Sequence, residues 1–526
     1  MQDNFSESQV VRKPAVRSRH GVVASQHIVA ANVGAKVLAQ GGDAVDAAIA
    51  TSMALGVVEP WMSGLAAGGC MVVWRAKDQK AYVVNFGMKS PLNLDPADYP
   101  LSGRGRGTDL FAWPHVVDDR NIKGATAVAV PGLVAGMELA HKTFGTKPWQ
   151  ELVMPAADLA EQGMRADWYS ALLTASNARD LCEDPDTAAA FFDEGRWPLV
   201  SGWTTLEQRR FNQKALAATL RTLANEGARS FYEGSIGQAL VRDVQAKGGC
   251  LSMADLEQYR AQIVDPLFFE YSRGKVFVAP ELTGGPTYLE ALQWLVKNAP
   301  DTRQLDAQAY RNVAQALDIA FENRLTKMGD HESPKAPGCT THFSVVDSEG
   351  NMCAVTQTLL SVFGSRVTSA STGILLNNGI MWFDPEPGKP NSLGPGKRCL
   401  TNYCPVIGMT SDGLQFAVGA SGGRKILGSV LQISRFMMQH GLTLEQAFEQ
   451  PRIDVSGGPR IIADHKLDPE ILEALAKVKP VDKARRNIYP YAYACPAGVA
   501  RQDGWNYGCT ELYTPWGDAV AADKLY

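Results

Sequence analysis

The sequence lacks the paired cysteine and histidine spacings that would indicate a disulfide framework or a metal site. Its nine cysteines are an odd number, and none stands in a C-x-x-C pair. Its eight histidines form no H-E-x-x-H motif. Scattered, reduced thiols are typical of cytoplasmic proteins, so we expect a cytoplasmic location. We also expect the protein to need no metal and no other cofactor.

Long hydrophobic runs and a surplus of positive charge are also missing. The longest apolar stretch, residues 44–58, is broken by Asp46, Thr51 and Ser52 and indicates a buried helix rather than a membrane span. The polar first twenty residues are not followed by an apolar run, which predicts no secretory signal. The formal net charge of -4 argues against nucleic acid and anionic membranes as partners.

The composition indicates a large α/β body. Hydrophobic residues make up 45% of the 526 positions, enough to bury a sizeable core. The length favours about three domains, although large α/β enzymes also fold around one core. Expected strands alternate with helices in blocks, which predicts a layered α/β architecture. The expected strands lie at 21–25, 71–74, 268–279, 341–346, 352–359 and 414–420, and the main expected helices at 27–40, 44–58, 149–162, 212–226, 235–246, 307–324 and 425–440.

The bond between Cys339 and Thr340 is the first candidate site. Residues 331–338 carry two prolines and a glycine and are expected to form a loop, and Thr340 then opens a β-rich run. If this bond were cut, Thr340 would carry a hydroxyl and a free α-amine. An α-amine with a pKa of about 7.7 to 8.0 accepts the hydroxyl proton near neutrality. On these residues alone, β-propensity is the simpler explanation of a threonine pair.

A nucleophile for acyl transfer also needs hydrogen-bond donors for the oxyanion. The turn Ser421-Gly422-Gly423 joins an expected strand to an expected helix. Backbone N–H groups of glycines there can approach a reacting carbonyl, and the helix dipole adds partial positive charge. A tight turn without a ligand is the plainer alternative.

Two further residues on the expected hairpin are candidates. Thr358 shares a strand face with Thr356 and is placed to hydrogen-bond a terminal amine or hydroxyl, although most such threonines are ordinary strand residues. His342 is a conceivable base. Because neighbouring side chains alternate between the faces of a strand, we expect His342 to face away from Thr340.

Six stretches together resemble the γ-glutamyltranspeptidase family of N-terminal-nucleophile hydrolases. They follow the family order across most of the chain, and the combination is specific. The resemblance makes Thr340 the expected nucleophile. The matching stretches are 41–48 (GGDAVDAA), 58–60 (VEP), 130–132 (VPG), 340–347 (TTHFSVVD), 373–378 (GILLNN) and 421–423 (SGG).

This resemblance implies an αββα sandwich that is made as an inactive precursor. Thr340 would attack the carbonyl of Cys339, and an N-to-O acyl shift followed by hydrolysis would divide the chain into residues 1–339 and 340–526. The two fragments would remain together as a heterodimer sharing one core, and a dimer of that unit is also conceivable. Gly422 and Gly423 would stabilise the oxyanion, and Thr358 would bond the nucleophile.

The sequence departs from the family where the family binds an amino acid. Gly87 stands in place of the arginine that binds the glutamate α-carboxylate, and Trp382 in place of the acidic residue that binds its α-amine. Gly379 replaces a glutamine, and Leu360 replaces an asparagine. Burying a zwitterion without ion-pair partners costs several kcal/mol, so γ-glutamyl substrates should bind poorly. The lid segment, 384–396, is also short.

Residues 377–388 and 394–398 resemble the subgroup of this family that contains oxamate amidohydrolases, which hydrolyse oxamate to oxalate and ammonia in purine catabolism. The oxamate carboxylate adjoins the scissile carbonyl, so it must be bound beside Thr340. The candidate ligands by position are Thr401 and Asn402, which replace a family serine pair, together with Arg366 and Arg424. For the two arginines a structural role is an equally good explanation.

Two alternatives stay open. One is a γ-glutamyl transferase or hydrolase, or an acylase for a larger amide. The other is a non-catalytic binding protein on an inherited scaffold. The second alternative is disfavoured because the chain keeps the family's candidate catalytic residues, which are Thr340, Thr358, Gly422 and Gly423.

Overall fold

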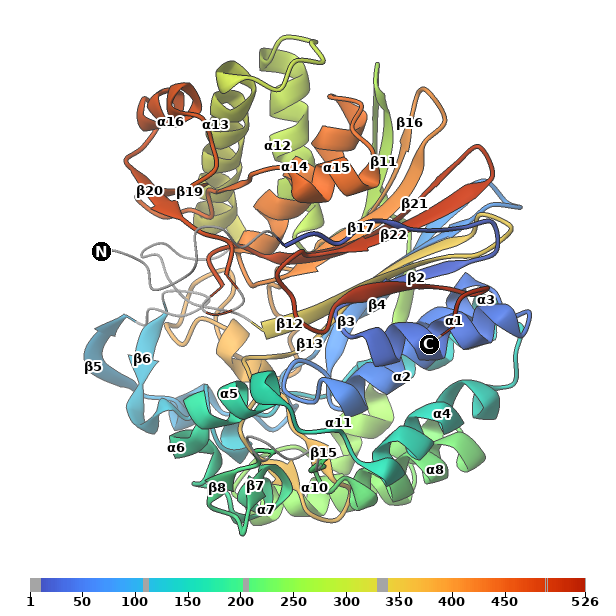
Figure 1. Ribbon diagram of the computed structural model, residues 1–526. Coiled ribbons are helices and arrows are strands. Elements are labelled where there is room, and N and C mark those ends of the chain that lie inside the picture. Colours follow the sequence, from blue (N-terminus) through green and yellow to red (C-terminus); the bar gives the residue numbers. More distant parts are fainter. Residues whose placement is uncertain are drawn as a thin grey trace.

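Two stacked β-sheets lie between layers of helices (Figure 1). The computed structural model describes residues 11–106, 113–201, 208–328, 339–487, 489 and 491–525. The loop predicted at 331–338 lies outside these residues. Within them, no helix is both long and apolar enough to cross a membrane.

The first sheet carries the candidate nucleophile on its third strand. All of its neighbouring strands pair antiparallel. Its order is β23 (Asp518–Ala521), β2 (Val22–Ser25), β12 (Cys339–Val346), β13 (Met352–Leu360), β3 (Gly68–Arg75), β4 (Lys80–Phe86) and β9 (Gln262–Val264).

The second sheet supplies the glycine turn and is also antiparallel. The segment expected to form one strand at 268–279 forms a hairpin instead, because the chain turns at Ser272 and Arg273 and pairs Phe268 with Phe277. The order is β1 (Val16–Ser18), β22 (Trp505–Thr510), β21 (Cys495–Gln502), β17 (Gln415–Ser421), β16 (Val406–Thr410), β11 (Gly274–Val278) and β10 (Leu267–Tyr271).

Helices cover the outer face of each sheet, which confirms the predicted αββα sandwich. The helix α2 (Ala44–Val58) buries 14 of its 15 residues, which accounts for its apolar residues on nearly every face. It begins with a capping box between Asp43 and Asp46. The first sheet is covered by α1 (Ile28–Ala39), α2 and α3 (Leu133–Phe144), with α4 (Trp149–Gln162) and α8 (Lys214–Glu226) beyond; the second is covered by α12 (Gly285–Asn298), α13 (Ala307–Asn323), α14 (Lys425–Met438) and α15 (Leu444–Glu449).

Smaller elements complete the described chain. The remaining helices are α5 (Trp168–Ser176), α6 (Ala178–Leu181), α7 (Pro185–Phe191), α9 (Arg229–Tyr232), α10 (Ser235–Ala246), α11 (Met253–Gln258) and α16 (Pro469–Ala476). The remaining strands are β5 (Leu101–Arg106), β6 (Pro114–Val116), β7 (Phe192–Asp193), β8 (Trp197–Pro198), β14 (Thr368–Ser369), β15 (Ile374–Leu375), β18 (Ile453–Asp454), β19 (Ile461–Asp464) and β20 (Val481–Ala484).

Side chains of β12 alternate between two buried environments. Phe343 and Val345 pack into the core beneath the helices α1 and α2. Val346 packs into the core between the two sheets, and His342 also faces the second sheet, against Gly419. The even-numbered face of β12 is therefore the one that meets the second sheet, and this face carries the candidate site.

Candidate active site

Thr340 lies near the start of β12 with only 5% of its surface exposed. Its Oγ1 atom is 3.5 Å from Oγ1 of Thr358 on the paired strand β13. The strand register shifts here, since Cys339 pairs with Leu360 whereas Thr341 pairs with Gln357. Such an irregularity re-aims side chains at the end of a strand, and it brings the two hydroxyls together.

The hydroxyl of Thr358 is held in place by the backbone. Its Oγ1 atom accepts a hydrogen bond of 2.8 Å from the N–H of Leu360. Leu360 has a φ of 89°, a left-handed conformation that is rare outside glycine. The predicted pairing of Thr340 with Thr358 is therefore present, and it is supported by a turn with an unusual backbone.

The expectation that His342 faces away from Thr340 is wrong. Residues two apart share a strand face, and His342 lies on the face that carries Thr356 and Thr358. Its ring nitrogens are engaged by the hydroxyls of Thr356, at 2.9 Å, and Ser344, at 3.0 Å. Burial lowers its pKa to about 3. His342 is thus a neutral, fully bonded histidine and a poor base.

The glycine turn follows β17 and begins α14. Gly422 and Gly423 have φ values of 129° and 60°, which favour glycine. Their carbonyls accept the first backbone hydrogen bonds of the helix, from Lys425 and Ile426. Within the described part of the chain, their N–H groups donate to no backbone acceptor. These N–H groups are therefore available at the positive end of a helix.

The glycine turn is tied to the sheet of the nucleophile. Ser421 exchanges hydrogen bonds with the side-chain amide of Gln26, at 2.7 and 3.0 Å. Gln26 directly follows β2, whose last residue, Ser25, pairs with Phe343 of β12. The end of β17 therefore lies over the beginning of β12, as an oxyanion site for Thr340 requires.

Arg324 is a buried residue of this region that the sequence analysis missed. It follows α13 and is 2% exposed. Its guanidinium donates to the carbonyl of Thr401 at 2.6 Å and to Oδ1 of Asn402 at 3.2 Å. No carboxylate among the described residues forms an ion pair with it, and burial lowers its pKa to about 10. An arginine at the end of a helix resembles an ordinary C-terminal cation, so no local pattern indicates its burial.

Asn402 presents an unused donor. Arginine is a donor only, so the atom of Asn402 that faces Arg324 must be the amide oxygen. The amide nitrogen of Asn402 then points elsewhere, and it has no hydrogen-bond partner among the described residues although it is buried. Thr401, the other half of the predicted pair, has its hydroxyl bonded to the carbonyl of Leu282 at 3.1 Å.

Arg424 lies close to this group. It follows Gly423 directly, is 8% exposed and interacts with Asp454. Burial lowers its pKa, and its positive charge in turn lowers the pKa of Arg324. Asn402 lies shortly before β16, and β16 pairs antiparallel with β17, the strand that leads into the glycine turn. The structure thus brings Arg324, Asn402 and Arg424 together beside the glycine turn.

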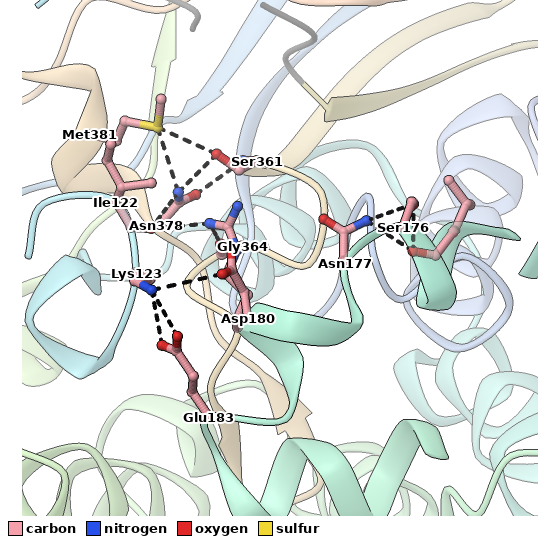
Figure 2. Close-up of polar contacts among 12 residues, drawn as sticks. Ile122, Lys123, Ser176, Asn177, Asp180, Glu183, Ser361, Gly364, Asn378 and Met381 are labelled. Carbon is pink, nitrogen blue, oxygen red and sulfur yellow. Dashed lines mark hydrogen bonds and ion pairs between the residues drawn. The ribbon is translucent and has the colours of Figure 1, made fainter. Parts of the chain in front are cut away.

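Arg366 is engaged elsewhere. Its guanidinium donates to the carbonyls of Gly364 and Ile122 at 3.0 and 3.3 Å and lies 3.6 Å from the carboxylate of Asp180. Figure 2 shows Asp180 also paired with Lys123, beside the hydrogen-bonded pair of Asn378 and Ser361. These contacts account for Arg366 as a structural residue, and a role in substrate binding stays a prediction.

Two of the positions that depart from the family, Gly87 and Trp382, have different surroundings in the structure. A Cβ atom on Gly87 would lie 3.7 Å from the guanidinium of Arg398, which donates to the Gly87 carbonyl at 3.0 Å. Trp382 is 2% exposed and packs edge-on against Tyr403, with ring centroids 5.3 Å apart. Its indole thus packs beside Tyr403, the residue that follows Asn402.

A comparison with known protein families shows which family this chain belongs to. The model of the family described as Gamma-glutamyltranspeptidase matches residues 30–339 and 333–485. The chain belongs to this family. The match covers both strands of the Thr340–Thr358 hairpin and the glycine turn, so the site described above lies within the family region.

Named relatives include two kinds of hydrolase. The chain is 32% identical to the acylase ACY 1 proenzyme of Pseudomonas sp. (strain V22), over 85% of this chain and 84% of that protein. It is 30% identical to the glutathione hydrolase proenzyme of Bacillus subtilis (strain 168), over 83% and 80%. The structure of cephalosporin acylase from Bacillus halodurans has the same fold, with a TM-score of 0.85 at 24% identity and 99% coverage of both chains. Both relatives are named as hydrolytic enzymes and as proenzymes.

Proposed function

We propose that this protein is a self-processed amidohydrolase that hydrolyses oxamate to oxalate and ammonia through an acyl-enzyme on Thr340. The observation that carries the proposal is the set of buried cationic and amide donors beside the glycine turn. Arg324, Arg424 and the amide nitrogen of Asn402 gather there, and an oxyanion role of that turn would bring the substrate's acyl group to them. Such a set suits a small acyl group that itself bears a carboxylate.

Maturation supplies the catalytic amine. Cleavage between Cys339 and Thr340 would give fragments 1–339 and 340–526, which would stay together because strands of both fragments alternate within the first sheet. The α-amine of Thr340 then takes the proton of its own hydroxyl. Thr358 orients that hydroxyl, which it approaches to 3.5 Å.

Turnover follows as two acyl transfers. Thr340 Oγ1 attacks the amide carbon, and the N–H groups of Gly422 and Gly423 stabilise the oxyanion. The carbon–nitrogen bond breaks, the amine proton passes to the leaving nitrogen, and ammonia departs. Water then hydrolyses the oxalyl ester, which restores the hydroxyl of Thr340.

The position of the carboxylate explains the choice of oxamate over a γ-glutamyl amide. In oxamate the carboxylate is bonded directly to the reacting carbonyl carbon, within reach of donors close to Thr340. A γ-glutamyl group would place its ammonium and carboxylate further away, and Trp382, at the position of the family's acidic residue, offers no charge to pair with that ammonium. An unpaired ammonium against an indole edge loses its hydration without compensation.

An acylase for a larger amide is the second candidate. It is favoured by the 32% identity to the acylase ACY 1 proenzyme. The two candidates differ in the size of the acyl group, which Trp382 limits in this chain. Replacing Trp382 by alanine should therefore shift preference toward larger acyl groups.

Ammonia release tests the proposal. Purified protein is incubated with oxamate, with a γ-glutamyl amide and with a long-chain acyl amide at equal concentration. We expect kcat/KM to be highest for oxamate. Preference for the γ-glutamyl or the acyl amide would replace oxamate as the substrate while leaving Thr340 as the nucleophile.

A further inference from the structure

Met88 lies on the face of the first sheet that carries the hydroxyls of Thr340 and Thr358. Thr358 pairs with Gly68 of β3, and residues paired across antiparallel strands point to the same face of a sheet. A Cβ atom on Gly68 would lie 2.7 Å from Cγ of Met88. Because Cβ positions directly opposite each other are about 5 Å apart, Met88 Cγ lies within about 8 Å of Thr358 Cβ. The side chain of Met88 therefore lies close to the hydroxyl partner of the nucleophile.

Met88 also occupies the space of a second missing side chain. Gly379 is the first residue of the short helix η5 (Gly379–Trp382), and a Cβ atom on it would lie 2.9 Å from Met88 Sδ. Neither Gly68 nor Gly379 has the positive φ that favours glycine. Lack of space therefore explains the glycine at both positions, since the thioether lies where either side chain would stand.

The backbone on both sides of Met88 is held by hydrogen bonds. The carbonyl of Gly87 accepts from the hydroxyl of Tyr259 at 2.8 Å. Lys89 exchanges backbone hydrogen bonds with Val130, at 2.8 and 3.4 Å. The Met88 side chain itself is 1% exposed. Met88 is thus a fixed part of the core between the two sheets.

This arrangement closes one direction in which an acyl group could extend from Thr340. An acyl group esterified to Thr340 Oγ1 begins beside Thr358. An acyl chain that ran on across β13 and β3 would pass over Gly68, which has no side chain of its own to exclude it. Met88 fills that space. The direction toward the glycine turn, where the buried donors gather, remains for a short acyl group that bears a carboxylate.

We propose that Met88 is a specificity-determining residue that sets the upper length of the acyl group accepted by this site. It forms no bond in the reaction and acts by occupying volume beside the substrate. The class of substrate that it selects is the monoamide of a short dicarboxylic acid. The inference rests on the proposed function, since it takes Thr340 Oγ1 to carry the acyl group.

A homologous series of monoamides measures this limit. The series is oxamate, malonamate, succinamate and glutaramate, which differ by one methylene at each step, and ammonia release gives kcat/KM for each. We expect wild-type kcat/KM to fall at least about tenfold from oxamate to succinamate. In Met88→Ala, the ratio of kcat/KM for succinamate to that for oxamate should rise at least about tenfold. Met88→Val removes less volume and should raise the ratio by a smaller factor, whereas Met88→Leu conserves volume and should keep the wild-type ratio.

Met71→Ala is the matched control. Met71 lies on the same strand as Gly68 and is fully buried, but it packs into the core beneath the helices, on the opposite face of the sheet. Its truncation removes the same side chain from the interior, so melting temperatures of the two alanine variants compare the loss of packing. The ratio for succinamate over oxamate should not change in Met71→Ala.

The inference and the proposed function fail in different ways. A ratio that is the same in wild type, Met88→Ala and Met88→Val would overturn the role of Met88, and so would an equal rise in Met88→Ala and Met71→Ala. A wild type that prefers a longer monoamide, with a preference that moves to still longer ones in Met88→Ala, would instead defeat oxamate as the substrate and support Met88 as the residue that sets acyl length.

Discussion

Arg324 donates to Oδ1 of Asn402 across 3.2 Å, and this bond fixes which end of the Asn402 amide remains available. The amide nitrogen is left as a buried donor without a partner among the described residues. A buried donor that lacks a partner costs about 1–3 kcal/mol. A bound carboxylate would remove that cost, which is the reason to place the substrate anion here.

The variant Asn402→Asp keeps the shape of the side chain and the contact with Arg324 but replaces the donor by a carboxylate oxygen. We expect kcat/KM for oxamate to fall about 100-fold, roughly 2.7 kcal/mol of lost transition-state stabilisation. Self-cleavage uses no external substrate and should proceed. Steady-state ammonia release and intact mass measure the two effects on one sample. Unchanged kcat/KM would remove Asn402 from the binding site.

Thr358 should matter to both maturation and turnover. Its hydroxyl is 3.5 Å from that of Thr340. Thr358→Val removes this neighbour, and we expect both rates to fall by about 10- to 100-fold, or roughly 1.4–2.7 kcal/mol. Thr358→Ser keeps the hydroxyl and serves as the control. If Val and Ser behave alike in time courses of cleavage and of ammonia release, the hydroxyl has no role.

Gly419 should tolerate no side chain. A Cβ atom there would lie 2.3 Å from Cε1 of His342, whose ring is fully buried and bonded at both nitrogens. Gly419→Ala should lower the free energy of unfolding by about 1–3 kcal/mol and slow self-cleavage, because the two sheets must separate locally. Gly64→Ala is the control, since a Cβ there meets nothing within 4 Å. Thermal melts of both variants would show whether the steric conflict is real.

The raised pKa of Glu59 makes a prediction about stability. Burial raises the pKa of Glu59 to about 7, so the folded protein holds a proton there up to about that pH, whereas an ordinary glutamate loses its proton near pH 4.5. Between these values the folded state binds more protons than the unfolded state, so this group lowers the free energy of unfolding as pH rises, by about 3 kcal/mol in all. Glu59→Gln removes the effect. In a Thr340→Ala background, its melting temperature relative to the parent should rise from pH 5 to pH 8; parallel curves would contradict the assignment.

The local patterns predicted many of the strands and helices, whereas the family resemblance predicted the sandwich and the pairing of Thr340 with Thr358. Period-two and helical patterns are local, so the helix at 44–58 and the hairpin of 341–346 with 352–359 were predicted closely. His342 was misplaced because residues two apart were treated as neighbours on opposite faces. Strand alternation puts residues 340 and 342 on the same face, so the sequence alone would have supported the correct placement.

Arg324 could not be found in the same way. It contacts residues 77 and 78 positions further along the chain, and these contacts follow from tertiary packing rather than from any local pattern. Arg366 is the opposite case, a residue that the sequence analysis named as a candidate ligand and that the structure shows engaged elsewhere. Its position near the Thr358 strand made it a candidate ligand, but a distant residue, Asp180, pairs with it. Burial and ion pairing of single charges depend on the three-dimensional neighbours.

Intact mass of the purified protein, beside a Thr340→Ala control, tests the central claim most directly. The account predicts two fragments from the wild type, residues up to 339 and residues from 340, and one whole chain from the control. A wild-type chain that stays whole while hydrolysing amides would contradict Thr340 as an N-terminal nucleophile.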